Sequence, residues 1–357
     1  MRYVLSSILL VLSMSSYAVQ VNGLYTAIVA VDDQSQSARN AAIHIAIRKV
    51  VQKVSGRQSV LQNRPLLGAL SNVSSYIEQF QYKEKEDDEL GFWLTIKFQK
   101  SALDKVMQQF DTPVWGSKRP AVLVWFAVEN DGVKYIVGSE ADESGLFTQA
   151  ALDVGLRITL PLLDIDDQRI ISFNDVWAGF SDQILLASER YEAKQMMYGR
   201  LLKDGENSWN LNWTLMGLSG QRSGLEQADT VENILSLAFL GVSEDLANIY
   251  APYGAISQSA ITINVKGVSD LTEFVEVTRY LSSLDMVKKL NWSQVTGDKV
   301  ELELSVIGRV SVLQDTIGLD NVLQPEARAY PLRTHFIDSQ KQGVSQPLKQ
   351  TLYYSIN

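Results

Sequence analysis

The sequence predicts a multi-domain protein of mixed α+β and α/β class. Strand-like and helix-like hydrophobic periodicities alternate along its 357 residues. A stretch rich in proline and glycine, DTPVWGSKRP, separates the first two patterned regions. The chain has no cysteine, so it has to rely on hydrophobic cores rather than on disulfides.

These observations divide the chain into a small α+β N-terminal domain, a middle α/β sheet domain with flanking helices, and a C-terminal ferredoxin-like βαββα unit. We therefore expect a signal peptide at 1–18, an N-terminal domain at 19–112, a middle domain at 119–255, a ferredoxin-like domain at 259–325 and a flexible tail at 326–357.

The first residues predict export. Arg2 and the amino terminus precede the apolar run VLSSILLVL, and the small residues Ser16 and Ala18 favour cleavage after Ala18. The run is short for a bilayer span, and an uncleaved N-terminal anchor is the alternative. Since no later stretch reaches about 18 apolar residues, we expect no transmembrane span in the mature chain. The expected location is the periplasm of a Gram-negative cell, because an exported chain without cysteine fits a bacterial periplasm better than a eukaryotic secreted fold. The lack of cysteine also excludes lipid attachment.

The composition argues against several classes of function. The chain carries 32 Lys and Arg against 41 Asp and Glu, a formal net charge of −9, so we expect no nucleic-acid partner. Two histidines and no cysteine argue against a histidine–cysteine metal site. The sequence contains no phosphate-binding glycine motif. We therefore expect no cofactor and no metal.

In the first domain, LYTAIVAVDD predicts a strand and ARNAAIHIAIRKVVQKVSG predicts an amphipathic helix. Ser35 or Ser37 is the candidate N-cap, and Gly56 is placed for a left-handed C-cap. We interpret His44, just off the apolar face, as part of a packing helix rather than a ligand. A short helix at Pro65, strands at 75–85 and 92–99, and a helix at 101–110 follow. The apolar face of the long helix consists of Ile43, Ile47, Val50 and Val54.

The middle domain begins with the continuous apolar run 121–129, which is typical of a strand buried on both faces. A helix is predicted over 144–158, and two more over 173–180 and 181–193. QMMYGRLLKDG and SWNLNWTLMG then predict a hairpin, and a long helix starts at the cap Thr230. The alternation in the second hairpin strand places on one face Trp209, Leu211, Trp213 and Leu215.

The C-terminal unit shows the order strand, helix, strand, strand, helix. The strand is AITINVKGV, and the first helix runs from the cap Ser269 to Leu284. A hairpin over 286–308 turns at Gly297, and the second helix is RVSVLQDTIGL. Periodicity fades after Pro325, so we expect the rest to be flexible.

The richest acidic motif is LLDIDDQ. Clustered carboxylates can bind a hard divalent cation, but aspartates in such a turn more often cap backbone amides and face water. Arg190, in ASERYEA, is expected to pair with a nearby carboxylate. Ser188 has no base nearby in the sequence and is expected to pack inside a helix. We identify no catalytic residue, and the candidate ligand- or partner-binding residues are Asp164, Asp166, Asp167 and Arg190.

Three tryptophans leave two interpretations open. Trp177, Trp209 and Trp213 could line a sugar or peptide groove, although the alternation around 209–215 favours the core. Catalysis by paired carboxylates, as in glycan hydrolysis, needs only two acids, whose separation in space the sequence does not give.

The order of motifs resembles the DUF2066 family of uncharacterised exported proteins of gammaproteobacteria. The resemblance rests on AVDDQSQSARNAAIHIAIRKVVQKVSG, LPLLDIDDQ, VWAGF, ASERYEAKQMMYGRLL and WNLNWTLMG, and covers roughly residues 20–325. It implies an envelope location and a multi-domain α/β architecture, and it supplies no catalytic residues. A fainter similarity in the first two domains is to periplasmic domains of penicillin-binding-protein activators and of the flagellar T-ring protein.

We therefore expect a non-enzymatic periplasmic protein that binds another envelope protein, with exposed strand edges that can accept a partner strand. The alternative is a carboxylate- or metal-dependent hydrolase of cell-wall material that uses the aspartate cluster. A third possibility is a small-ligand receptor with its site between the first two domains.

Overall fold

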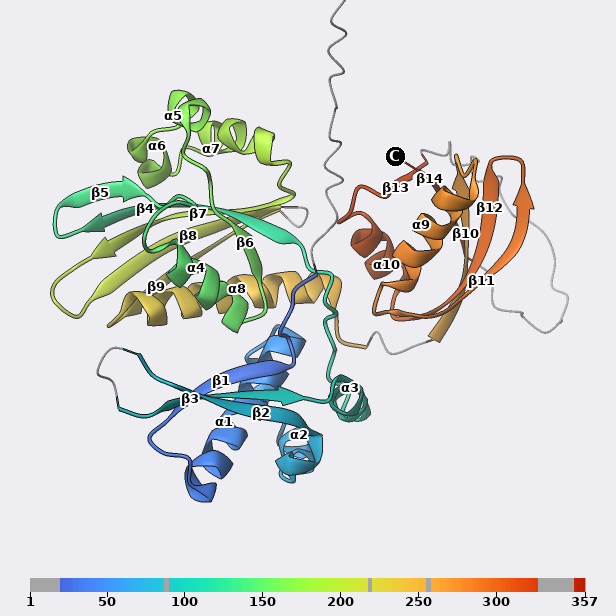
Figure 1. Cartoon of the computed structure of the whole chain (residues 1–357). Coiled ribbons are helices and arrows are strands. Elements are labelled where there is room, and N and C mark those ends of the chain that lie inside the picture. Colours follow the sequence, from blue (N-terminus) through green and yellow to red (C-terminus); the bar gives the residue numbers. More distant parts are fainter. Residues whose placement is uncertain (1–19, 87–89, 218–219, 255–257, 327–349, 357) are drawn as a thin grey trace, which may run out of the picture.

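The computed structural model describes residues 20–86, 90–217, 220–254, 258–326 and 350–356. This part of the chain contains three sheets, and each sheet packs with its helices around hydrophobic side chains (Figure 1). The predicted mixed class of helices and sheets is confirmed. Within the described residues, no helix is both long and apolar enough to cross a bilayer.

The N-terminal unit is an antiparallel sheet of order β1-β3-β2. Alternate residues of β1 and β3 are buried against the helices, which cover one face of the sheet. The elements are β1 (Thr26–Val31), α1 (Gln36–Ser55), the 3₁₀ turns η1 (Ser59–Gln62) and η2 (Val73–Tyr76), α2 (Arg64–Ala69), β2 (Ile77–Glu84), β3 (Phe92–Phe98) and α3 (Lys100–Gln109).

Helix α1 is the packing helix that the sequence predicts. The hydroxyl of Ser35 accepts from the amide of Ala38, and Gly56 ends the helix at φ +69°. The predicted apolar face is buried, and His44 is exposed. The helix therefore supplies core residues along its length.

The middle unit is a mixed sheet of order β5-β4-β7-β8-β9, with β6 paired to β4. β4 is buried on both faces, as predicted, because helices lie on both sides of it (Figure 1). The elements are β4 (Ala121–Asn130), β5 (Val133–Ile136), α4 (Ser144–Asp153), β6 (Arg157–Thr159), α5 (Ile165–Ile170), α6 (Phe173–Ala178), α7 (Ser181–Ser188), η3 (Glu189–Tyr191), β7 (Gln195–Lys203), β8 (Trp209–Gly217), β9 (Gly220–Ala228) and α8 (Val231–Tyr250).

The middle unit differs from the prediction in several details. The helix expected over 181–193 ends at Ser188, and the 3₁₀ turn η3 follows it. The helix expected over 144–158 ends at Asp153, because Gly155 turns the chain at φ +79° and the following residues pair with β4 as β6. β9 is a third strand of the expected hairpin. Its GQRSGLEQA sequence carries few β-forming residues, so its pairing with β8 comes from tertiary context.

The C-terminal unit is a five-stranded sheet of order β11-β12-β10-β14-β13. Asp270 caps its first helix by accepting from the amide of Glu273, one residue after the predicted cap Ser269. The elements are β10 (Gln258–Lys266), α9 (Leu271–Ser282), β11 (Val287–Thr296), β12 (Lys299–Ile307), α10 (Val310–Ile317), β13 (Leu323–Pro325) and β14 (Gln350–Ile356).

The C-terminal strand departs from the prediction. β10-α9-β11-β12-α10-β13 follows the ferredoxin-like βαββαβ order, but β14 lies between β10 and β13 and runs parallel to β10. The expected flexible tail is therefore wrong for Gln350–Ile356, whose Leu352 and Tyr354 are buried in the core. The sequence does not predict the pairing of β14 with β10, because β10 lies more than 80 residues upstream. The rest of the expected tail, 327–349, lies outside the described residues.

The link between the first two units is buried. The amide of Trp115 donates to Val54 O, which ties the link to the end of α1. The Arg119 guanidinium donates to the carbonyls of Val54, Trp115, Gly116 and Gly155. These bonds join the N-terminal unit, the link and the middle unit.

Candidate functional site

The predicted aspartate cluster lies at the start of α5. Asp164 caps this helix: its Oδ1 accepts from the amides of Asp166 and Asp167, both at 3.1 Å. The guanidinium of Arg190 binds Asp164 with two bonds, of 2.6 and 2.9 Å. These bonds, the one from Arg190 first, lower the pKa of Asp164 to about 2.

Asp167 is the buried member of the cluster. Its carboxylate accepts from Arg190 at 3.1 Å, from the hydroxyl of Tyr191 at 2.5 Å and from the amide of Leu163 at 2.8 Å. Burial, followed by this bond to Asp167, raises the pKa of Tyr191 to about 12. Asp166 instead points to solvent, 3.6 Å from Arg169. The network thus fixes the turn before α5 against η3.

The structure brings Asp164, Asp167 and Arg190 together and leaves Asp166 apart. Because every oxygen of Asp164 and Asp167 has a donor within the chain, the cluster holds its own loop in place. Among the described residues, no group of three or more acids and histidines is arranged to bind a metal ion.

The other side chains for which the sequence left a functional role open lie in or near the core. Ser188 is buried; it accepts from Trp125 Nε1 at 3.0 Å and donates to Ile184 O at 2.6 Å. Trp209 and Trp213 are buried between β8 and α8. Trp177 is half-buried and stacks on Phe173.

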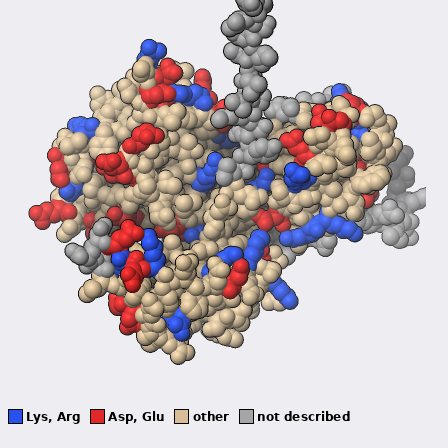
Figure 2. Space-filling model, in the orientation of Figure 1, with Lys and Arg blue, Asp and Glu red and all other residues tan. Residues whose placement is uncertain are grey.

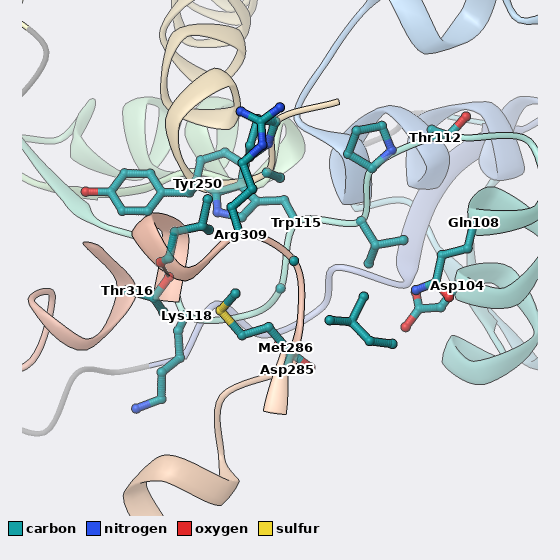
Figure 3. Close-up of a pocket in the computed structure, with 18 of the residues that line it drawn as sticks. Asp104, Gln108, Thr112, Trp115, Lys118, Tyr250, Asp285, Met286, Arg309 and Thr316 are labelled. Carbon is teal, nitrogen blue, oxygen red and sulfur yellow. Dashed lines mark hydrogen bonds between the residues drawn. The ribbon is translucent and has the colours of Figure 1, made fainter. Parts of the chain in front are cut away.

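A cleft opens where the three units meet, and we call it the junction cleft. Its cavity volume is about 150 Å³, which is smaller than the roughly 300–1,000 Å³ of typical small-molecule sites. Figure 3 shows Asp104 and Gln108 at one end, Tyr250, Thr316 and Lys118 at the other, and Trp115, Arg309 and Met286 between them. α3, the link, the end of α8 and the C-terminal unit all contribute to its wall.

Charges in the junction cleft join the units. Asp285 of the C-terminal unit accepts from the amide of Ser117 at 2.7 Å and lies 3.1 Å from the ammonium of Lys100. Lys118 binds the buried carboxylate of Asp320 at 2.7 Å. Two cations that line the cleft, Lys288 and Arg309, bind only carbonyl oxygens among the described residues. Lys288 binds Asp285 O, and Arg309 binds Tyr253 O. They remain able to neutralise an incoming carboxylate.

A second feature begins at this cleft. Met286 and Lys288 line the cleft, and β11 runs outward from Val287 as the last strand of its sheet. Within the described residues β11 pairs only with β12, so its outer edge offers free backbone donors and acceptors. Register shifts between Val287 and Lys289 and between Trp292 and Gln294 interrupt this edge.

Exposed apolar side chains of α9 and β11 lie beside this edge, and we call the surface that they form the β11 groove. Trp292 and Val295 pair across from the core residues Leu302 and Val300, so they lie on the helix side of the sheet. They are nevertheless exposed. The exposed fractions of the four side chains of the groove are 74% for Leu271, 38% for Val275, 65% for Trp292 and 54% for Val295.

Helix periodicity places the other wall of the groove. Tyr280 marks the flank of α9 that faces α10, since its hydroxyl donates to Ile317 O at 3.1 Å. Leu271 and Val275 lie on the opposite flank, one turn apart, on the side of β11. The hairpin was predicted, but its open edge was not, because strand order in a sheet depends on distant segments.

Comparison with known proteins corrects the family expectation. No curated protein matches the chain. Residues 18–116 match the model of a domain of unknown function (DUF8605), which covers just over a quarter of the chain. The expected membership of DUF2066 is therefore wrong: its motifs were individually weak, and the matched family is a different one. The match covers the N-terminal unit and the start of the link, so this part of the chain is similar to DUF8605.

Proposed function

We propose that this chain is a non-enzymatic protein-binding module of the bacterial envelope, exported to the periplasm, and that it binds an extended segment of a partner protein in the β11 groove. The observation that carries the proposal is an open edge strand beside an exposed apolar helix flank. A partner strand can satisfy the backbone of β11 while its alternate side chains pack on Trp292 and Leu271.

The charge near the groove favours an acidic partner segment. Lys288 and Lys289 stand at the start of β11, and basic side chains gather along this edge of the C-terminal unit (Figure 2). The rest of the chain is acidic overall, so this edge is electrostatically distinct. The interrupted register and the lysines restrict indiscriminate strand pairing, which favours a specific partner.

Site-specific crosslinking in cells tests the proposal. Because the chain lacks cysteine, single cysteines at Lys289 and Gln294 can carry a probe along β11, with Lys49 of α1 as the control position. We expect the β11 probes to capture an envelope protein that the Lys49 probe does not capture.

A substitution separates binding from folding. Trp292→Ala removes an exposed side chain, so stability should change by less than about 0.5 kcal/mol while capture falls at least several-fold. Val133→Ala, at an exposed position of β5, is the matched control and should leave capture unchanged. Equal capture by wild type and Trp292→Ala, or identical proteins from all three probe positions, would contradict the proposal.

A further inference from the structure

The two faces of the middle sheet are covered unequally. α4 and α8 lie on one face, and α5, α6 and α7 lie on the other (Figure 1). α6 packs on β4, β5 and β7, whereas the side chains of β8 and β9 on that same face stay half-buried or exposed. This uncovered part of the sheet, which we call the amide face, is independent of the β11 groove.

The amide face carries hydrogen-bonding side chains and no acid. Register places Asn210 opposite Gln227, Asn212 opposite Leu225, Thr214 opposite Ser223 and Met216 opposite Gln221. The acids and bases of β9 lie on the other face: Glu226 accepts from Trp213, and Arg222 binds Asp245.

Arg200 supplies the positive charge of the amide face. It pairs with Asn212 across β7 and β8, and the Asn212 amide oxygen, turned toward the guanidinium, accepts from Nε at 3.0 Å and Nη2 at 2.9 Å. Among the described residues Arg200 has no carboxylate partner within 4.0 Å; Glu129 of β4, on the same side, binds Lys134 at 3.5 Å. The guanidinium is thus held in place by a neutral group and remains available to an anion.

Aromatic rings border the amide face. Trp177 lies with its ring centroid 6.0 Å from the Arg200 guanidinium, and it is held by stacking on Phe173 at 5.3 Å. Gly179 passes close to the ring of Tyr198, and the next residue, Phe180, is exposed. Phe173 and the Arg200 guanidinium lie against the Trp177 ring, so this ring holds the guanidinium in position. The amides and the guanidinium suit an acidic sugar, whose hydroxyls bond to amides and whose carboxylate bonds to a guanidinium.

We propose that the amide face binds an acidic glycan, with Asn210 and Gln227 on sugar hydroxyls and Arg200 on a sugar carboxylate. An anionic occupant is favoured because Arg200 has no carboxylate partner among the described residues, and Glu129, the acid of β4 on this side, binds Lys134 instead. A partner protein in the β11 groove would leave this surface free.

Calorimetric titration of the full chain with three probes tests the assignment. Oligogalacturonate should bind, a neutral malto-oligosaccharide of equal length should bind about tenfold more weakly, and oligoglutamate should not bind. Failure of all three to bind, or oligoglutamate binding as tightly as oligogalacturonate, would overturn the proposal.

Variants locate the site. Arg200→Gln should weaken oligogalacturonate binding about tenfold, and Asn210→Asp should weaken it at least as much by placing a like charge beside the carboxylate. Arg222→Gln, on β9 and on the opposite face of the sheet, is the matched control and should leave affinity within about twofold. Equal losses in Arg200→Gln and Arg222→Gln would also overturn the proposal, since they would indicate a nonspecific charge effect.

Discussion

At the scale of single residues, buried arginines hold the junction together by donating to backbone carbonyls. Arg119 bonds to four carbonyls, and Arg57 donates to Ala247 O at 2.8 Å and to Asn248 Oδ1 at 3.1 Å at the end of α8. Burial lowers the pKa of Arg119 to about 9, so its guanidinium stays protonated at neutral pH. A guanidinium suits this task because it presents five donors in a rigid plane.

Gly56 is required beside these contacts. Its φ is +69°, and a Cβ would lie 2.7 Å from Trp115 Cε3 and 2.9 Å from the Cβ of Ala247. Gly56→Ala should therefore lower the free energy of unfolding by about 2 kcal/mol or more, from left-handed strain and overpacking. Gly68→Ala, in α2 with open space around the added methyl group, should be neutral or slightly stabilising. Urea unfolding of both variants measures the difference; equal effects would exclude the packing argument.

At the scale of elements, the segment after 349 completes a sheet. β14 pairs with β10 on one side and with β13 on the other. Without β14, one edge of β10 would have no partner strand. Its apolar alternation is short, with Leu352 and Tyr354 facing the core. Seven residues with two core positions resemble many surface segments, so the strand becomes evident only beside β10.

The strand assignment makes a measurable prediction. Amides of 351–355 should exchange as slowly as those of β10, because ladder hydrogen bonds protect them. Leu352→Ala should cost about 2–4 kcal/mol and speed this exchange, whereas Thr351→Ala, on the opposite face, should cost less than about 1 kcal/mol. Fast exchange at 351–355 in the wild type is the result incompatible with a docked β14.

At the scale of the whole molecule, a few polar contacts attach the C-terminal unit to the other two. Asp285 is central, because it binds Lys100 of α3 and Ser117 of the link. Burial alone would raise the pKa of Asp285, but the Ser117 amide and the Lys100 ammonium hold this pKa below its usual value. The attachment is therefore linked to the ionisation of one carboxylate.

This linkage predicts an acid dependence. A carboxyl whose folded pKa is lowered stabilises the fold fully above its ordinary pKa of about 3.9 and loses that contribution as pH falls through the folded value. Asp285→Asn should therefore cost about 1–3 kcal/mol at pH 7, and the difference from wild type should shrink below about pH 4. Thermal unfolding between pH 2 and 7 measures it, with Asp298→Asn at the exposed hairpin turn as the control. A difference independent of pH would rule out ionisation of Asp285 as the cause.

The sequence by itself determined what depends on neighbours along the chain. Helix α1 has its N-cap Ser35, its apolar face and its C-cap Gly56 within about 20 residues. In β8, buried and half-buried side chains alternate along the nine residues of the strand. Local hydrogen bonds and periodic burial dictate such elements. The pairing of Arg190 with the aspartates was also foreseeable from charge, although its role in fixing a loop was not.

Only the tertiary structure decided which strands form edges and which faces stay uncovered. The β11 groove depends on β11 being last in its sheet, and the amide face depends on α6 ending over β7. Residues far apart in the chain, such as Arg200 and Trp177 or Asp285 and Lys100, meet only after the sheets have formed. Binding surfaces of this kind arise from long-range contacts, whose loop-closure cost and geometry leave no periodic trace in the sequence.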